Sequence, residues 1–352
     1  MDFSLFYFAD DGSASIDRYR LLIEGARFAD SHGFSAVWTP ERHFHAFGGH
    51  YPNPAVTGAA VAAATERIAI RAGSVVAPLH HPVRIAEEWA VVDNLSGGRI
   101  GIAFASGWHA VDFALRPENY ADRRGVLTDT IETVQRLWRG ESVELADATG
   151  TPVQVRVYPV PVQPDVPIWL TSMGSPATFR HAGELGAGVL THLMGQDLDD
   201  LAKKISMYRQ GFQARNTSGG NGHIVLMLHT FLGADREEVR EIVRKPFSDY
   251  LRSSLGLITR ASGDVLPDIK PEDIDPADLE FLVERAFDRY FETGGLFGTV
   301  EDGMRMLARL AEVGVDEVAC LIDFVGDTYA VLGSLDYLEK LRAASLGTAQ
   351  DA

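Results

Sequence analysis

One strand-helix-strand unit constrains the fold of this chain more than any other part of the sequence. Residues 68–76 and 100–105 form short apolar runs with β-branched side chains, which is typical of strands covered on both faces. Between them, Pro82 suits a first helical turn, apolar side chains recur at roughly helical spacing, and Gly97 and Gly98 end the helix. Such a unit implies two parallel strands joined by a right-handed crossover. The residues that follow the two strands are therefore expected at the same end of a sheet.

The same alternation runs through the whole chain. Helix-length amphipathic segments separate candidate strands at residues 3–8, 36–39, 68–76, 100–105, 168–171, 188–191, 224–232 and 317–322. Eight such units predict an α/β fold, a (β/α)8 TIM barrel with insertions, in which catalytic groups lie at the carboxyl ends of the strands. A doubly wound sheet also alternates in this way, but the chain lacks a G-x-G-x-x-G motif after its first strand. We therefore favour the barrel.

Residues 1–345 are expected to form a single domain with two insertions, followed by a disordered tail at residues 346–352. Residues 141–163 carry alternating valines before prolines, which indicates a small hairpin. In residues 253–298, Gly, Pro and Asp interrupt a weak helical pattern. A long irregular segment of this kind is usually a functional lid or disordered.

Composition and charge exclude several classes of function. The chain has 352 residues, 46% of them hydrophobic and 23% charged, which is an ordinary balance for a globular protein. Its formal net charge of −17 disfavours nucleic acid or an anionic membrane as a partner. The sequence shows no secretory signal and no membrane-spanning run, and its one cysteine, Cys320, lies in an apolar run. We therefore expect no internal disulfide, a cytoplasmic location and a core position for Cys320.

Three motifs carry a resemblance to a known family. They are WTPERHF at residues 38–44, HPVRIAEEWAVVDNLSGGR at residues 81–99 and TSMGSPATFRHAGELGAG at residues 171–188. Their order and spacing resemble the bacterial luciferase-like flavin-dependent monooxygenase superfamily, and the likeness covers nearly the whole chain. The stretches GWHAVDFAL at residues 107–115 and PENYADRR at residues 117–124 resemble the subgroup associated with polyketide and nonribosomal peptide biosynthesis. The resemblance implies a luciferase-like barrel and favours a mobile lid for residues 253–298.

The resemblance also implies that FMN binds with its phosphate at the loop and helix after the fifth strand. The matching residues are Ser175 and Thr178, in a loop that also contains Met173 and Gly174. Ser175 fits an N-cap and Pro176 a first turn, so exposed amides and two hydroxyls at a positive helix end suit a phosphate. An ordinary capped helix has the same pattern.

Two further strand ends are implied to contact the flavin. Many family members place an arginine after the fourth strand, where this chain has Ser106, so either another cation compensates or FMN binds more weakly. Gly73 and Ser74 fall where the family often has a non-proline cis peptide, although a tightly packed strand glycine fits the same position. The other residues expected beside the flavin ring are Ala105, Gly107 and Trp108.

Candidate catalytic residues follow the second and fourth strands. Where the family commonly has two histidines after a glutamate, this chain has Glu41, Arg42 and His43. The histidine that serves as a base in luciferase is thus replaced by Arg42, and aldehyde oxidation with light emission is not expected. Arg42 suits an anionic or carbonyl group of a substrate, a peroxide oxygen, or a structural ion pair with Glu41. His109 is a second candidate acid or base, because imidazole exchanges protons near neutral pH.

No metal site is expected, despite several histidines near the strand ends. The chain has no H-E-x-x-H motif and no cysteine cluster, and the family needs no metal. His81 is expected to bond the loop backbone, and His80 to face the pocket.

The resemblance implies a two-component enzyme that uses reduced FMN and O2, with a separate flavin reductase as the source of reduced FMN. The leading hypothesis is a monooxygenase that hydroxylates a natural-product biosynthetic intermediate, either free or bound to an acyl or peptidyl carrier protein. Arg123 and Arg124 are a candidate docking patch for such a carrier, or alternatively a solvated helix face. A homodimer is usual for the family.

Two other functions stay open. A deazaflavin-dependent dehydrogenase uses the same barrel, but its cofactor has an acidic tail and favours extra cations near the phosphate pocket, whereas Ser106 removes one. A non-catalytic flavin-binding subunit is the other alternative, against which the retained Glu41, His43 and His109 argue.

Overall fold

Eight parallel strands close into a barrel in the computed structural model, which describes residues 1–9, 17–215, 220–261 and 275–348. The first strand, β1 (Asp2–Phe6), pairs in parallel with the last, β11 (Glu317–Leu321), so the sheet closes on itself. The barrel strands between them are β2 (Ala36–Thr39), β3 (Ala69–Val76), β4 (Ile100–Ala105), β7 (Ile168–Ser172), β8 (Gly188–His192) and β9 (Ile224–Leu232). The predicted (β/α)8 barrel is confirmed.

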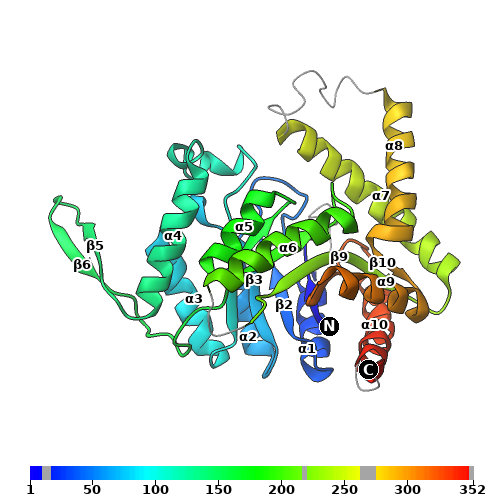
Figure 1. Ribbon diagram of the computed structural model, residues 1–352, viewed down its shortest axis with the longest axis horizontal. Coiled ribbons are helices and arrows are strands. Elements are labelled where there is room, and N and C mark those ends of the chain that lie inside the picture. Colours follow the sequence, from blue (N-terminus) through cyan, green and yellow to red (C-terminus); the bar gives the residue numbers. More distant parts are fainter. Residues whose placement is uncertain (10–16, 216–219, 262–274, 349–352) are drawn as a thin grey trace.

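Helices surround the barrel, as Figure 1 shows. They are α1 (Arg20–Ser31), α2 (Pro54–Ala64), α3 (Pro82–Ser96), α4 (Arg123–Trp138), α5 (Pro176–Leu185), α6 (Leu198–Arg215), α7 (Arg236–Ala261), α8 (Pro276–Arg289), α9 (Val300–Val313) and α10 (Thr328–Thr348). Short helical turns are η1 (Ala77–Leu79), η2 (Asp112–Ala114), η3 (Pro117–Asn119) and the π-helical η5 (Tyr290–Gly294). Among the described residues, no helix combines the length and the apolar character needed to span a membrane.

The strand-helix-strand unit singled out in the sequence forms β3, α3 and β4. Pro82 stands in the first turn of α3, and the His81 side chain accepts the Val83 amide at 3.3 Å, so His81 does bond the loop backbone. Gly97 ends the helix in the left-handed conformation, with φ 68°, which glycine adopts without steric cost. The helix boundaries read from proline and glycine are therefore confirmed.

Apolar side chains fill the barrel both inside and outside. The interior cluster consists of Phe6, Ala36, Trp38, Ala103, Trp169, Leu190, Val225, Met227, Ala319 and Leu321. A larger core lies between the strands and the helices, and it contains Cys320, whose thiol pKa is raised to about 12 by burial. The predicted core position of Cys320 is confirmed.

A buried ion pair closes the amino-terminal end of the barrel. Glu317, at the start of β11, accepts Arg71 Nη1 at 2.8 Å, Trp38 Nε1 at 3.0 Å and Ser4 Oγ at 2.5 Å. The Arg71 guanidinium lies 5.0 Å from the Trp38 ring and 4.7 Å from the Trp169 ring. Burial alone would raise the pKa of Glu317, but Arg71 holds it below the usual range. These five residues, called the barrel plug below, fill this end.

The two insertions differ in how well the sequence predicted them. Strands β5 (Val143–Ala146) and β6 (Pro152–Val155) form the expected hairpin, which projects from the barrel in Figure 1. Where residues 253–298 are described, they are mostly helical rather than irregular, because α7 and α8 pack together and the short strand β10 (Leu296–Gly298) joins β9. An aromatic cluster around Phe247 and Phe287 holds this packing together. The last helix runs to Thr348, beyond the predicted domain end at residue 345, and residues 349–352 lie outside the described part.

Candidate active site

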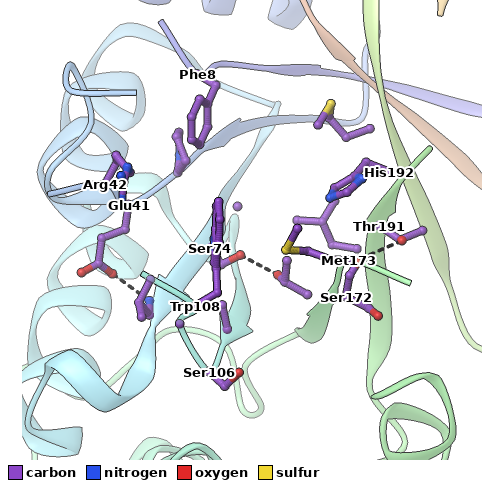
Figure 2. A pocket seen from close by; sticks show the side chains of 18 of the residues that line it. Phe8, Glu41, Arg42, Ser74, Ser106, Trp108, Ser172, Met173, Thr191 and His192 are labelled. Atoms are coloured by element: carbon purple, nitrogen blue, oxygen red, sulfur yellow. Dashed lines mark hydrogen bonds between the residues drawn. The ribbon is translucent and has the colours of Figure 1, made fainter. Parts of the chain in front are cut away.

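A cavity of about 370 Å³ opens at the carboxyl ends of the barrel strands (Figure 2). In a (β/α)8 barrel this is the end where catalytic groups lie, and the volume is within the range of small-molecule sites. Its walls are largely apolar and include Phe6, Phe8, Phe47, Val76, Trp108, Met173, Leu190, Met194, Met227 and Tyr250. The cavity is therefore the candidate site for a cofactor and a substrate.

Two hydroxyls and two arginines line one end of this cavity, at the starts of two helices. Ser175 and Thr178 belong to the start of α5, and Arg123 and Arg124 to the start of α4. Ser175 occupies the predicted N-cap position, but its side chain makes no capping hydrogen bond. Instead, Ser172 Oγ accepts the amides of residues 174 and 175, both at 3.1 Å. The Ser175 hydroxyl is thus left for a ligand, at a helix end that favours anions.

The arginines supply the positive charge that Ser106 does not. Arg123 is half-buried and donates Nε to the Gly107 carbonyl at 3.2 Å and Nη1 to the Tyr120 carbonyl at 3.1 Å. Arg124 is exposed, and no acidic side chain pairs with it anywhere in the described ranges. Because Ser106 carries no charge, either another cation compensates or FMN binds more weakly. The positions of Arg123 and Arg124 favour the first alternative. Ser106, Arg123, Arg124, Ser175 and Thr178 are called the phosphate end below, after the phosphate that the sequence resemblance implies at Ser175 and Thr178.

The third and fourth strands form the wall that the sequence predicted. The Gly73–Ser74 peptide bond is cis, and Ser74 Oγ lies 2.5 Å from Thr171 Oγ1 of β7. A Cβ on Gly73 would lie 2.7 Å from the Phe6 ring, so this position has room for glycine alone. The predicted contact residues that line the cavity are Gly73, Ser74, Ala105, Ser106, Gly107, Trp108, Met173, Ser175 and Thr178. Gly174 does not line it, and serves the turn before α5 with φ 104°.

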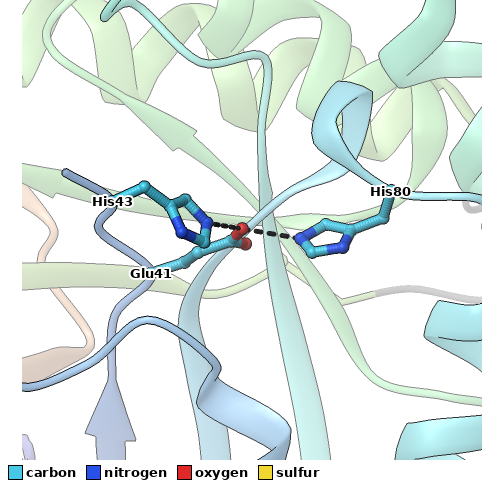
Figure 3. Close-up of side chains that lie close together, drawn as sticks. All are labelled: Glu41, His43 and His80. Atoms are coloured by element: carbon cyan, nitrogen blue, oxygen red, sulfur yellow. Dashed lines mark hydrogen bonds and ion pairs between the residues drawn. The ribbon is translucent and has the colours of Figure 1, made fainter. Parts of the chain in front are cut away.

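Glu41 lies at the centre of a hydrogen-bond network beside the cavity (Figure 3). Its Oε1 lies 2.7 Å from His43 Nε2 and 2.6 Å from His80 Nε2, and its Oε2 accepts the Val76 amide at 2.7 Å. Burial opposes charge on both groups, but these hydrogen bonds hold the pKa of Glu41 below and that of His80 above their usual values. Since the carboxylate only accepts, both imidazoles donate through Nε2.

Arg42 pairs with Asp112 rather than with Glu41. Its Nη1 donates to both Asp112 carboxylate oxygens, at 2.9 and 2.7 Å, and the alternative of a Glu41–Arg42 ion pair was therefore wrong. Both side chains line the cavity. Burial raises the pKa of Asp112 against the opposing effect of Arg42. Arg42 Nε and Nη2 bond no residue in the described part of the chain, so they remain available to a ligand.

The two candidate histidines lie behind the cavity wall rather than in it. His43 contacts Glu41, and neither His43 nor His109 is among the lining residues. His109 Nε2 is buried without a hydrogen-bond partner, and burial, together with Arg42 and His45, lowers the pKa of His109 to about 3. His80, which was expected to face the pocket, instead donates to Glu41. All three histidines therefore reach the cavity only through a neighbouring side chain.

Glu41, His43 and His80 also lie close enough to hold a metal ion, with their ligand atoms within 4.8 Å of one another. Both imidazoles, however, hydrogen-bond to the same carboxylate oxygen at 2.6 and 2.7 Å. A metal ion would have to replace these hydrogen bonds, so we interpret the group as a proton-sharing network.

Sequence reasoning missed several cavity residues. Phe47 follows β2 in a loop, and Tyr250 comes from the middle of α7, where no strand end marks it. His192 was not missed in the same way: the sequence indicates it as a polar residue at a strand end, and it does end β8 and line the cavity. Arg123 and Arg124, which were assigned to a surface patch, line the cavity because the segment before α4 folds back over β4.

The fold and the site define a class: a (β/α)8 barrel with a largely apolar cavity at its catalytic face, lined in part by hydroxyls and arginines at helix starts. Residues 1–317 match the model of a family described as luciferase-like monooxygenase, and the chain belongs to this family. The oxygenase component of a flavin-dependent trigonelline monooxygenase from Acinetobacter baylyi is 30% identical over 251 residues, which cover 69% of this chain and 68% of that protein. An F420-dependent glucose-6-phosphate dehydrogenase from Amycolatopsis mediterranei is 31% identical over 180 residues, 49% of this chain and 53% of the relative.

Solved structures share the whole fold. Monooxygenase RslO1 from Streptomyces bottropensis superposes with a TM-score of 0.79 at 21% identity, covering 98% of this chain and 100% of the other. The oxygenating constituent of 3,6-diketocamphane monooxygenase from Pseudomonas putida, in complex with FMN, gives a TM-score of 0.73 at 19% identity and covers 97% of each chain. At these identities the likeness shows the fold alone.

Proposed function

We propose that this protein is the oxygenase component of a two-component system that uses reduced FMN and O2 to hydroxylate a small organic substrate. One observation carries the proposal: the phosphate end opens directly into an apolar cavity at the catalytic face of a luciferase-like barrel. FMN has a dianionic phosphate and a flat apolar ring system, and these two parts match the two parts of the cavity. When bound and reduced, FMN supplies the activation of O2.

The chain's own residues have separable tasks in this proposal. Ser175, Thr178 and Arg124 bind the phosphate, because hydroxyls, a helix end and an unpaired guanidinium suit an anion. Apolar walls exclude water and thereby limit proton leakage. Arg42 offers Nε and Nη2 to an oxygen atom of the substrate or of the reacting group, while Asp112 holds it in place.

The proposed partner is a separate reductase, since the Acinetobacter baylyi relative is itself an oxygenase component. A natural-product intermediate, free or carrier-bound, remains the proposed substrate class, a homodimer the proposed assembly and the cytoplasm the proposed location. Because Arg123 and Arg124 line the cavity, a docking carrier protein would have to use another surface.

A deazaflavin-dependent dehydrogenase is the second candidate. The argument against it was a missing cation at Ser106, and the two arginines at the phosphate end remove that argument. The F420-dependent relative, similar over about half of each chain, also supports it. In this case Arg123 and Arg124 would bind the acidic tail of coenzyme F420.

The test compares the two reduced cofactors. Purified protein is equilibrated with reduced FMN or reduced F420 without oxygen, affinities are measured by equilibrium dialysis, and air-saturated buffer is then mixed in while flavin absorbance is followed. The proposal expects tighter binding of reduced FMN and slower return of oxidised FMN than in free solution. Tighter binding of F420 with no effect on FMN reoxidation would select the dehydrogenase. Tight FMN binding with reoxidation as fast as in free solution would indicate a non-catalytic flavin carrier.

A further inference from the structure

His192 lies at the end of β8 with its imidazole facing the cavity. In the view of Figure 2, Arg42 lies on the left and His192 on the right, Phe8 lies above and between them, and Ser106 of the phosphate end lies at the bottom. No function assigned so far uses His192. Within the part of the chain that the structure describes, it is nevertheless the one histidine that lines the cavity.

Local backbone geometry fixes which nitrogen of His192 carries a proton. The Met194 amide donates to His192 Nδ1 at 3.1 Å. An amide N–H requires an acceptor, so Nδ1 is unprotonated and the hydrogen of the neutral ring sits on Nε2. Burial also lowers the pKa of His192 to about 4, which keeps the ring neutral at pH 7. Toward the cavity, His192 Nε2 is therefore a hydrogen-bond donor and cannot act as a base.

Among the described residues that line the cavity, none places an unpaired positive charge beside His192. His229, close to it on β9, is buried among Phe247, Tyr250 and Phe324, and burial lowers its pKa to about 3. Of the arginines that line the cavity, two belong to the phosphate end, and Asp112 balances the charge of the third. An anionic group near His192 would thus lose its hydration without gaining a cation. A neutral oxygen acceptor fits this end better.

Three aromatic side chains form a continuous surface in the cavity. The Phe47 ring lies 5.1 Å from the Phe8 ring and 4.7 Å from the Tyr250 ring, and all three line the cavity. Such a surface favours flat aromatic or compact polycyclic molecules, whose rings pack against it with offset or edge-on geometry. Together with the Nε2–H donor of His192, this aromatic surface selects both the shape of a substrate and the atom by which the substrate is hydrogen-bonded.

We propose that His192 is the specificity-determining residue of this site, and that its Nε2–H binds a carbonyl oxygen of a neutral aromatic or polycyclic ketone substrate. This inference rests on the proposed function, because it assigns the substrate to the part of the cavity that the phosphate end leaves open. Nδ1 stays with the Met194 amide, so the donor direction is fixed before the substrate arrives.

The test uses two neutral probes that share one skeleton. 1-Tetralone has a ketone beside a benzene ring, and tetralin is the same bicycle without oxygen. Binding of each to protein saturated with FMN is measured by titration calorimetry, for the wild type, His192→Leu and His192→Gln. The wild type is expected to prefer the ketone by about three- to tenfold, the range of one hydrogen bond. The His192→Leu variant should bind both probes equally. The His192→Gln variant should keep part of the preference for the ketone, because the glutamine amide can still donate a hydrogen bond at this distance.

Each outcome has a defined meaning. Equal binding of both probes to the wild type, or an unchanged preference in His192→Leu, overturns the inference. Loss of FMN binding in His192→Leu, with melting temperature preserved, also overturns it, since the imidazole would then serve the cofactor. If the variants fail to fold, ¹⁵N NMR of the wild-type imidazoles decides, because a protonated Nδ1 on His192 contradicts the argument. Failure of the wild type to bind FMN at all would instead refute the proposed function.

Discussion

Arg124→Met tests the phosphate end most directly, because this guanidinium lines the cavity, is exposed and pairs with no acidic group in the described residues. Its charge is therefore fully available to a ligand. By contrast, Arg123 donates to two backbone carbonyls and helps to hold the loop. Losing one charge-assisted hydrogen bond costs about 1.5–3 kcal/mol, so FMN should bind roughly 10- to 150-fold more weakly.

Riboflavin, which has the same ring system without the phosphate, makes the assay selective. Affinities for FMN and riboflavin are measured by quenching of flavin fluorescence at two salt concentrations. Arg124→Met should weaken FMN binding, leave riboflavin binding unchanged and reduce the salt dependence of FMN binding. Arg84→Met is the matched control, since Arg84 is an exposed arginine of α3 that pairs with Glu87 and Glu88 and does not line the cavity. An equal loss for both flavins, or no loss for FMN, would refute the reasoning.

Three further predictions concern other parts of the molecule. Ser175→Ala combined with Thr178→Ala should weaken FMN binding by about 1.5–3 kcal/mol per lost hydrogen bond, and unchanged affinity in the same fluorescence titration would remove both residues from the phosphate end. His43→Ala should leave FMN affinity nearly intact, because His43 does not line the cavity, but should slow substrate oxygenation in single-turnover mixing with O2; an undiminished rate would reduce His43 to a packing role. Glu317→Gln should destabilise the fold by about 3–5 kcal/mol at pH 7 in urea unfolding, because it leaves Arg71 buried without its partner. The folded-state pKa of Glu317 is lowered, so the stabilisation by its charge is complete above the unfolded value of 4.5 and is lost as the pH falls further. The free energies of unfolding of wild type and variant should therefore become equal in acid. A difference that stays constant to low pH would contradict the ion pair.

The sequence was most informative where local chemistry repeats along the chain. Alternating apolar runs and helix ends marked by Pro82 and Gly97 predicted the strands and helices, because each signal depends only on near neighbours. The count of eight such units then predicted the barrel. The wall at Gly73 and Ser106 followed from the rule that parallel strands end on one face.

Contacts between residues that are far apart in the chain could not be predicted from the sequence. Nothing in the sequence around Arg42 indicates that it selects Asp112, 70 positions away, instead of its neighbour Glu41. The position of Tyr250 depends on how α7 packs over the barrel mouth, which no periodicity reveals. From the sequence, Arg124 fits either a docking patch or a solvated helix face, because its orientation depends on the loop before α4.

The barrel plug has a consequence for how this scaffold can change. Glu317 and Arg71 form their ion pair at the end of the barrel opposite to the cavity, and neither lines the cavity. The residues that stabilise the closed barrel here are therefore separate from the residues that line the candidate site. Exposed residues at the cavity, such as Trp108 and Met173, can therefore be substituted at a lower cost in folding free energy than the barrel plug. Buried cavity residues such as Gly73 do not share this tolerance, because a Cβ there would meet the Phe6 ring at 2.7 Å.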